Sequence, residues 1–419
     1  MAPPVSAVLP SIEAVREAVS QLLSDPAVLQ QDRELVVRTV LHHLHLQPPQ
    51  VSGLEMFLQL VWERLNTGHW AEVWPGWRTL YGLLSLARVR LVLGLVEEEG
   101  RLQQADLLRD LVKMCDLGLL LGGPDILGGA LETLAQNITD HLASGFRLSE
   151  ETGPASKKAR LCSTLCDINQ HKLPLPLPLQ DIPVLEFPDI PSFVTACKAR
   201  RLVTKLTGAM EDWPAVRSSV RAWSVERLRR LAGPRTVPVE IGQRYTDQDW
   251  TQQLMTVEEF ARDFLTGNCS RVGYLAQHQL LSQVPALRED IITPDYCFTG
   301  DTEEEEEVEV NVWIGPAGTI SPAHTDKKHN VLCQVSGYKY VAIFYPDMTD
   351  QLYPDPAPMF HNTSRVDLDR PDTEKFPLVR QLEGHHTILG PGEMLYIPPL
   401  VWHYVRSLET SFSVSFWWQ

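Results

Sequence analysis

The chain has 419 residues, of which 44% are hydrophobic, and it carries a formal net charge of -16. This length exceeds what one ordinary core organises, so we expect two or three domains. The acidic balance argues against direct reading of nucleic acid, because attraction to phosphates needs a basic surface. It favours basic partners such as Arg- and Lys-rich peptides, although solubility alone explains an acidic surface equally well.

The cysteines and the N-terminal residues indicate the compartment. The seven cysteines are scattered, and Cys162 and Cys166 form only a weak metal-binding pair because no second pair lies near them. The first residues, MAPPVSAVLPSIEAV, lack a basic start followed by an apolar run, and no uninterrupted apolar stretch is long enough to cross a bilayer. We therefore expect no signal peptide, no membrane span and reduced thiols in the nucleus, with the cytoplasm as the alternative.

Residues 1–147 are expected to form a helical domain. Apolar residues recur at helical spacing in LEMFLQLVWERL and in a second long segment that ends before Gly122-Gly123-Pro124. ALETLAQNITDHLA adds another amphipathic segment. We find no catalytic combination of residues in this region, so we interpret it as a bundle or short solenoid that serves as a scaffold or docks a partner.

Residues 148–183 are predicted to be a Pro-rich linker, or a strap over the next domain. KLPLPLPLQDIP alternates Pro with Leu, which blocks helix and favours extended polyproline geometry. Lys157-Lys158-Ala159-Arg160 resembles a minimal nuclear-import signal. Four residues match such signals with low specificity, so a solvated turn explains them nearly as well.

Residues 184–419 are predicted to be a mostly β domain, which makes the chain α+β. Short β-branched or aromatic runs are separated by turn signals such as Ser336-Gly337 and Pro391-Gly392, a pattern typical of a sandwich or barrel. WSVERLRRLAG and TVEEFARDFLTG are expected to be helical, and the acidic run from Glu303 to Glu307 to be a mobile surface loop. The strand runs are VPVEIGQ, VEVNVWIG, NVLCQVSG, YKYVAIFYP, HHTILG, EMLYIPP, HYVRS and SFSVSFWW.

His324-Thr325-Asp326 is the first candidate for metal binding. Residues i and i+2 of a strand point to the same side, so His324 and Asp326 can converge on one ion, with His403 as the third ligand. Two histidines and one carboxylate leave open coordination positions, which is the ligand set of non-haem Fe(II) oxygenases. Zinc accepts the same ligands, and a strand histidine held only by hydrogen bonds is the alternative to any metal site.

Lys339 is the second unusual residue. It belongs to the predicted strand YKYVAIFYP, where an ammonium is costly to bury without a paired anion. The carboxylate of 2-oxoglutarate would supply that anion. The alternative is that Lys339 points to solvent.

TISPAHTDKKHNVLCQVSGYKYVAIFYP followed by PGEMLYIPPLVWHYVRSLETSFSVSFWW resembles the JmjC oxygenases. The resemblance is clearest over residues 184–419 and implies a double-stranded β-helix, a jelly-roll of the cupin type. It implies Fe(II) held by His324, Asp326 and His403, with 2-oxoglutarate and O2 as co-substrates. It also implies 2-oxoglutarate contacts from Tyr274, Gln277, Ser321, Asn330, Lys339 and Trp417, and a pocket lined by Trp313.

The expected activity is oxidation of a protein side chain. Hydroxylation of an arginine carbon in a basic protein needs a carboxylate to hold the guanidinium. Glu240 and Trp250 are the candidates, by fork pairing and cation–π contact. An ordinary salt bridge and a core tryptophan are the alternative interpretation of these two residues. N-methyl-lysine demethylation of histones is the alternative reaction.

Two rival functions belong to other classes. A non-catalytic chromatin adaptor would use the helical region and keep a vestigial barrel, but the intact ligand set argues against it. A peptidase lacks support, because neither HExxH nor a Ser/His/Asp order occurs. We expect a monomer, since the last strand signal runs to Trp418 and is followed by no helices that could pair.

Overall fold

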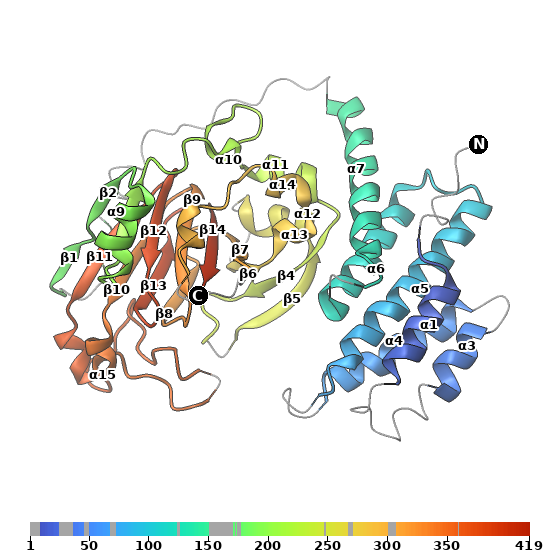
Figure 1. Ribbon diagram of the computed structural model, residues 1–419, viewed down its shortest axis with the longest axis horizontal. Helices are drawn as coiled ribbons and strands as arrows, with labels where there is room; N and C mark the ends of the chain where they lie inside the picture. The colour runs from blue at the N-terminus through green and yellow to red at the C-terminus, as the bar shows by residue number, and fades with distance from the viewer. Residues whose placement is uncertain are drawn as a thin grey trace. The chain divides into compact units, whose positions relative to one another are not determined.

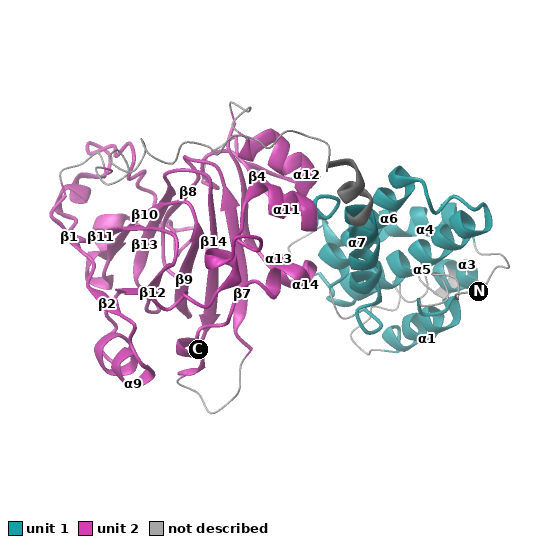
Figure 2. Cartoon of the chain, turned by 90° about the horizontal axis from the view of Figure 1, so that it is seen from above, with its two compact units in different colours: residues 1–153, 232–236 teal, residues 154–231, 237–419 magenta. Residues whose placement is uncertain are grey.

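The computed structural model divides the chain into two compact units (Figure 2). One unit comprises Met1–Gly153 and Ala232–Thr236, and the other comprises Pro154–Leu231 and Val237–Gln419. The structure describes residues 9–24, 37–45, 50–67, 73–123, 126–150, 171, 173, 177–246, 249–266, 271–300, 307–358 and 360–419, without the side chains of 144–150. Cys162, Cys166, the import-like motif and all of the acidic run except Glu307 lie outside these ranges.

The first unit is helical, as the apolar spacing predicts. Its core is built around α5, which packs against α1, α4 and α6, while α7 packs on α6. Leu80, Leu84 and Ala87 on α5 are fully buried. The helices are α1 (Ile12–Leu22), α3 (His42–His45), α4 (Val51–Leu65), α5 (Gly76–Glu98), α6 (Ala105–Gly122) and α7 (Ala130–Glu150), with the π-helical η2 (Val37–Leu41).

Helix α5 is long and apolar enough to cross a membrane by length and composition alone. Arg88 and Arg90 interrupt its apolar residues, so the sequence contains no uninterrupted apolar stretch of membrane-spanning length here. Within the unit 61% of its most apolar window is buried. Burial of this extent is what the central helix of a helical core requires.

The second unit contains two sheets (Figure 1). The smaller has the order β1-β11-β10-β13-β8, and the larger has the order β2-β3-β12-β9-β14-β7-β6-β4-β5. The strands are β1 (Leu179–Asp181), β2 (Val184–Glu186), β3 (Thr204–Thr207), β4 (Thr236–Ile241), β5 (Thr251–Thr256), β6 (Gly273–His278), β7 (Glu309–Gly315), β8 (Ile320–His324), β9 (His329–Ser336), β10 (Lys339–Phe344), β11 (Gly384–Leu389), β12 (Glu393–Ile397), β13 (Trp402–Ser407) and β14 (Ser411–Trp418).

Short helices accompany the strands of this unit. Figure 1 shows α11 to α14 gathered on the side of the β4–β7 strands. They are α9 (Ile190–Phe193), α10 (Pro214–Arg217), α11 (Val225–Ala232), α12 (Val257–Phe260), α13 (Leu280–Gln283), α14 (Pro285–Arg288) and α15 (Thr349–Leu352), with η4 (Val194–Lys198), η5 (Ala261–Leu265), η6 (Asp295–Phe298), η7 (Pro346–Met348) and η8 (Pro377–Gln381).

Strands β7 to β14 form the jelly-roll. Along the chain β7, β9, β12 and β14 lie in the larger sheet and β8, β10, β11 and β13 in the smaller, so that consecutive strands change sheet except at the β10–β11 pair. Neighbours in each group pair antiparallel, as β9 does with β12 and β14. This arrangement confirms the expected α+β chain with a double-stranded β-helix.

Strand β10 is buried on both faces, and its two faces contact different cores. Val341 and Ile343 pack with Leu332 and Leu395 of the larger sheet, inside the jelly-roll. Tyr340 and its same-face neighbours pack outside, against the segment between β10 and β11. Because side chains alternate along a strand, Lys339 shares the inner face with Val341 and Ile343. Its burial at 1% exposure excludes the alternative in which it points to solvent.

Most of the predicted linker lies outside the described ranges. Its last residues include β1, which pairs parallel to β11 at the edge of the smaller sheet. Tyr340 also contacts His171 from this segment, with ring centroids 4.7 Å apart. The described part of the segment therefore packs on the edge and outer face of the smaller sheet.

Candidate metal centre and co-substrate pocket

Two adjacent strands of the smaller sheet position the candidate metal ligands. His324 ends β8, and His403 lies near the start of β13, directly opposite it in the antiparallel register. The register then shifts between His403 and Val405, which places Ser321 opposite Val405. A hydrogen bond from the Leu400 amide to the Asp326 carbonyl, 2.7 Å long, joins the loop before β13 to the third candidate ligand.

His324, Asp326 and His403 form the one metal-sized group of His, Cys, Asp and Glu side chains found among the described residues. Their ligand atoms all lie within 4.8 Å of one another. The Nδ1 atoms of His324 and His403 lie 2.8 Å and 3.1 Å from the carbonyl oxygens of Pro322 and Val401. Each Nδ1 therefore donates to the backbone, which leaves the Nε2 atom of each ring available as a metal ligand.

The electrostatics of this cluster suit a cation. Burial, and secondarily the neighbouring His324, lower the pKa of His403 to about 4, so the ring is neutral near pH 7 and can ligate. The Oδ2 atom of Asp326 is buried and accepts no hydrogen bond from the described residues, although it lies 3.5 Å from His403 Nε2. A divalent metal would satisfy that carboxylate and both imidazoles at once, so the donor set fits Fe(II).

A small cavity of about 30 Å³ adjoins the cluster and contains most of the predicted site residues. Among the predicted residues, Tyr274, Trp313, Ser321, Asn330, Lys339 and Trp417 line it together with the three candidate ligands. Sequence reasoning did not name four further lining residues, namely Leu332, Ile397, Val405 and Ser415. Strand alternation from Asn330, His403 and Trp417 points to three of them, because positions two apart share a face.

Lys339 supplies the positive charge of this cavity. Its ammonium donates to the hydroxyl of Tyr274 at 3.2 Å and forms no ion pair with a carboxylate in the described part of the chain. Burial lowers the pKa of Lys339 to about 7. Two neighbouring polar atoms, Asn330 Oδ1 and Trp417 Nε1, are buried without a hydrogen-bond partner among described residues. An ammonium and an indole N–H with spare capacity are the groups that a dicarboxylate such as 2-oxoglutarate requires.

The affinity for 2-oxoglutarate is expected to depend on pH through Lys339. A bound carboxylate favours the ammonium, so binding is strongest below the free pKa of about 7 and weakens as pH rises through it. Above that pH we expect roughly a tenfold loss per pH unit. Anaerobic titration with 2-oxoglutarate between pH 6 and pH 9 measures this. A flat profile, or the same profile in the Lys339→Ala chain, would contradict the assignment.

Three predicted residues do not line this cavity. Gln277 is exposed, with a positive φ of 46°, at the irregular part of β6, and the structure does not bring it to the co-substrate pocket. Glu240 lies on β4 directly opposite Tyr274 on β6, and Trp250 directly precedes β5. Glu240 and Trp250 are both half-buried.

Tyr245 is a neighbour of the metal cluster that the sequence did not reveal. Burial raises its pKa to about 12, with added contributions from the charges of Asp326 and Glu240. Its hydroxyl lies 3.2 Å from the Thr363 hydroxyl. Thr363 in turn forms an isolated antiparallel bridge with His324. A tyrosine in a loop carries no periodic signal, which is why chain pattern alone could not find it.

A jelly-roll that holds two histidines and a carboxylate beside a buried lysine defines the class of non-haem metal oxygenases. Residues 204–419 match the family of cupin-like domains. The chain is 37% identical to "Lysine-specific demethylase 8" of Xenopus tropicalis, and the alignment covers 87% of each chain. It is 34% identical to "Jumonji C domain-containing protein 5" of Drosophila melanogaster, covering 92% of this chain and 93% of that one. The chain therefore belongs to the JmjC family of oxygenases, as its motifs indicated.

Proposed function

We propose that this chain is an Fe(II)- and 2-oxoglutarate-dependent dioxygenase that oxidises a cationic side chain of a protein. His324, Asp326 and His403 would hold the metal, and Lys339 would pair with the distal carboxylate of 2-oxoglutarate. The bound metal and co-substrate supply the activation of O2. The chain itself binds and orients the substrate side chain and excludes water from it. This positioning selects the C–H bond that reacts.

The side chains of the pocket have separable tasks. Burial and the charge of Glu240 raise the pKa of Tyr274, so its hydroxyl stays protonated and can donate. Lys339 neutralises one carboxylate, and the indole N–H of Trp417 adds a further donor. Leu332, Ile397 and Val405 close the cavity with apolar surface, which keeps water away from the reacting atoms.

The observation that carries the substrate proposal is the environment of Glu240. Its carboxylate is half-buried, and burial raises its pKa while the neighbouring Trp250 partly lowers it. No ion pair links it to a cation among the described residues, yet its charge acts on both Tyr274 and Tyr245. A carboxylate that is partly desolvated, lacks a cationic partner among the described residues and lies opposite Tyr274 of the metal cavity suits a substrate that brings its own positive charge.

Two reactions fit a cationic side chain at this place. N-methyl-lysine demethylation is the first candidate, because relatives in Xenopus tropicalis and Danio rerio carry the name "Lysine-specific demethylase 8". Hydroxylation of an arginine carbon is the second, because the two oxygens of Glu240 can accept a guanidinium fork and Trp250 lies beside them. Either reaction suits basic protein substrates in the nucleus, the location that we propose.

Mass spectrometry separates the two reactions. Peptides that contain arginine or N-methyl-lysine are incubated with the full chain, Fe(II), 2-oxoglutarate and O2. Loss of a methyl group with release of formaldehyde identifies a demethylase, and gain of one oxygen on arginine identifies a hydroxylase. Peptides that stay unchanged under conditions in which the chain converts 2-oxoglutarate would contradict both candidates.

The Glu240→Gln substitution is expected to reduce peptide oxidation far more than conversion of 2-oxoglutarate without peptide. The change keeps the side-chain shape but removes the charge proposed to hold the substrate, which costs about 1.5–3 kcal/mol for a charged hydrogen bond. Turnover with and without peptide is compared for this variant. The matched control is Glu409→Gln, since Glu409 is also half-buried with a pKa raised by burial. Equal loss of both activities in Glu240→Gln would make Glu240 structural.

A further inference from the structure

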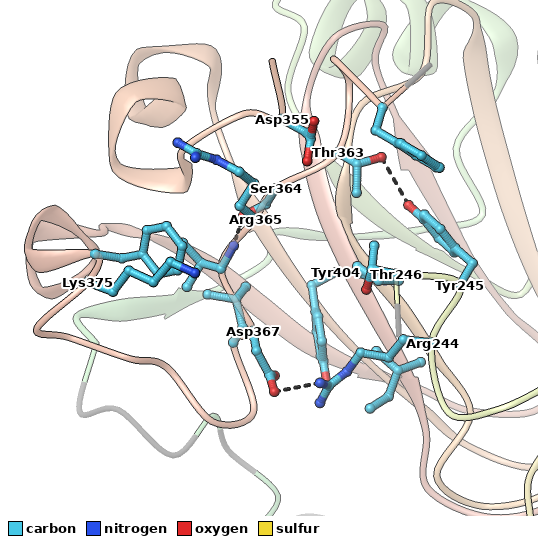
Figure 3. A pocket seen from close by; sticks show the side chains of 16 residues that line it. Arg244, Tyr245, Thr246, Asp355, Thr363, Ser364, Arg365, Asp367, Lys375 and Tyr404 are labelled. Atoms are coloured by element: carbon cyan, nitrogen blue, oxygen red, sulfur yellow. Dashed lines mark hydrogen bonds and ion pairs between the residues drawn. The ribbon is translucent and has the colours of Figure 1, made fainter. Parts of the chain in front are cut away.

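A second, larger cavity of about 510 Å³ lies beside the metal centre and shares no lining residue with it (Figure 3). Its walls come from the loop after β4, from β8 and β13, and from the segment between β10 and β11. Ile320 and Pro322 of β8 line it, whereas Ser321 between them lines the metal cavity. The two cavities therefore lie on opposite faces of the same edge strand.

One end of this cavity touches the metal centre. Thr363, which lines the cavity, forms a bridge with His324. The hydroxyl of Tyr245 lies 3.2 Å from that of Thr363, and Figure 3 shows the two side chains pointing toward each other. A polypeptide that binds in this cavity would therefore lie close to His324 at this end.

The charged side chains in the wall next to Tyr404 form ion pairs with one another. Arg244 forms ion pairs with Asp367 and Asp369, and Asp369 also pairs with Arg406. The hydroxyl of Tyr404 donates to Asp369 at 2.5 Å. These charges satisfy one another and leave a preformed wall beside apolar lining that includes Val366 and Leu368.

The remaining charges differ between the two ends. Asp355 lies at the metal end, where its amide donates to the carbonyl of Thr363 at 2.9 Å. Arg365 and Lys375 lie at the other end, both over the ring of Phe376, at 5.8 Å and 5.1 Å from its centroid. Both cations are exposed, and neither forms an ion pair with a carboxylate of the described ranges. In Figure 3, Arg365 and Lys375 lie on the side of the cavity away from Tyr245.

We propose that this cavity binds the part of the substrate polypeptide that flanks the oxidised residue, and that it takes an apolar side chain followed by a carboxylate. The inference deepens the proposed function and rests on it. The volume is large enough for side chains of a polypeptide and too large for 2-oxoglutarate alone. The acidic metal end suits the cationic target residue, and the cationic outer end suits an acidic residue near it. A uniformly basic segment would meet repulsion from Arg365 and Lys375.

Anaerobic binding of fluorescent peptides to the full chain with Fe(II) and 2-oxoglutarate tests this inference. Each peptide has one central arginine or N-methyl-lysine as the target. A leucine followed by Glu, Gln or Lys stands before the target in one set of peptides and after it in a second set. The peptides carry no other charge. Fluorescence anisotropy gives the dissociation constants. The Glu peptide is expected to bind about five- to tenfold more tightly than the Lys peptide on one side of the target, and less so at high salt.

Two double variants separate this cavity from general charge. In Arg365→Gln with Lys375→Gln the preference for Glu over Lys is expected to fall to about twofold or less. The matched control is Arg370→Gln with Arg380→Gln, which removes two exposed cations from the same segment that do not line the cavity. This control is expected to keep the preference.

The results distinguish a failure of the flank site from a failure of the proposed function. Equal binding of the three peptides, no binding of any, or a preference that survives Arg365→Gln with Lys375→Gln overturns the flank site. If the dissociation constant depends on the flanking residue as expected but the peptide is not oxidised once O2 is admitted, the proposed function is contradicted and the flank site stands. Oxidation without any flank preference contradicts the flank site alone.

Discussion

Asp326→Ala and His324→Ala chains are expected to fold normally and to lose turnover. Each change removes one of three candidate ligands, whereas the apolar interior of the jelly-roll stays intact. The loss should exceed the roughly 10–100-fold that typically follows removal of a hydrogen-bond partner of a metal ligand. Succinate formation from 2-oxoglutarate measures turnover, and thermal unfolding of the metal-free chain measures stability.

The matched control for this pair is His361→Ala. His361 also donates from Nδ1 to a backbone carbonyl, that of Pro358 at 2.7 Å, but it is exposed and lies outside the cluster. Its substitution is expected to leave both measurements unchanged. Near-normal succinate formation in Asp326→Ala or His324→Ala would show that these residues hold no catalytic metal.

The second large effect is expected from Lys339→Ala. The ammonium is buried on the inner face of β10, where the carboxylate of 2-oxoglutarate would be its ionic partner. Loss of one member of a buried ion pair typically costs about 3–5 kcal/mol, which weakens binding by hundreds- to thousands-fold. Isothermal titration with 2-oxoglutarate measures the loss, and titration with Mn(II) should show metal binding nearly unchanged.

Lys205→Ala is the control for a lysine that is partly buried elsewhere. Its ammonium already pairs with Glu393 at 2.7 Å and does not line the cavity. Its substitution should leave the affinity for 2-oxoglutarate near that of the unmodified chain. An unchanged affinity in Lys339→Ala would mean that another group receives the carboxylate.

The strands of the jelly-roll that carry long β-branched or aromatic runs could be predicted from sequence. Each of the eight expected runs overlaps a strand, including β10 and β14, because strands buried inside a sandwich are made of such residues. Strand β8 has the sequence ISPAH and is not among the predicted strand runs. An edge strand tolerates proline and small residues, which removes the usual pattern.

Some residues of the candidate site could be predicted from the sequence, and others could not. His324, Asp326 and Lys339 could be found because each is chemically unusual at its place in the sequence, and the structure brings all three to one cavity. Gln277 could not be judged from sequence, because the irregularity of β6 turns its side chain to solvent. The flank cavity was also beyond sequence reasoning, since its walls come from segments that meet only in the folded chain.

The most direct test of the account is a paired measurement of succinate and of the oxidised peptide from the same reaction. We predict that both form together, in comparable amounts, only when Fe(II), 2-oxoglutarate and O2 are all present, and that neither forms with Asp326→Ala. Peptide oxidation that proceeds without 2-oxoglutarate, or equal yields from Asp326→Ala and the unmodified chain, would contradict the assignment of this site as the centre of a 2-oxoglutarate-dependent dioxygenase.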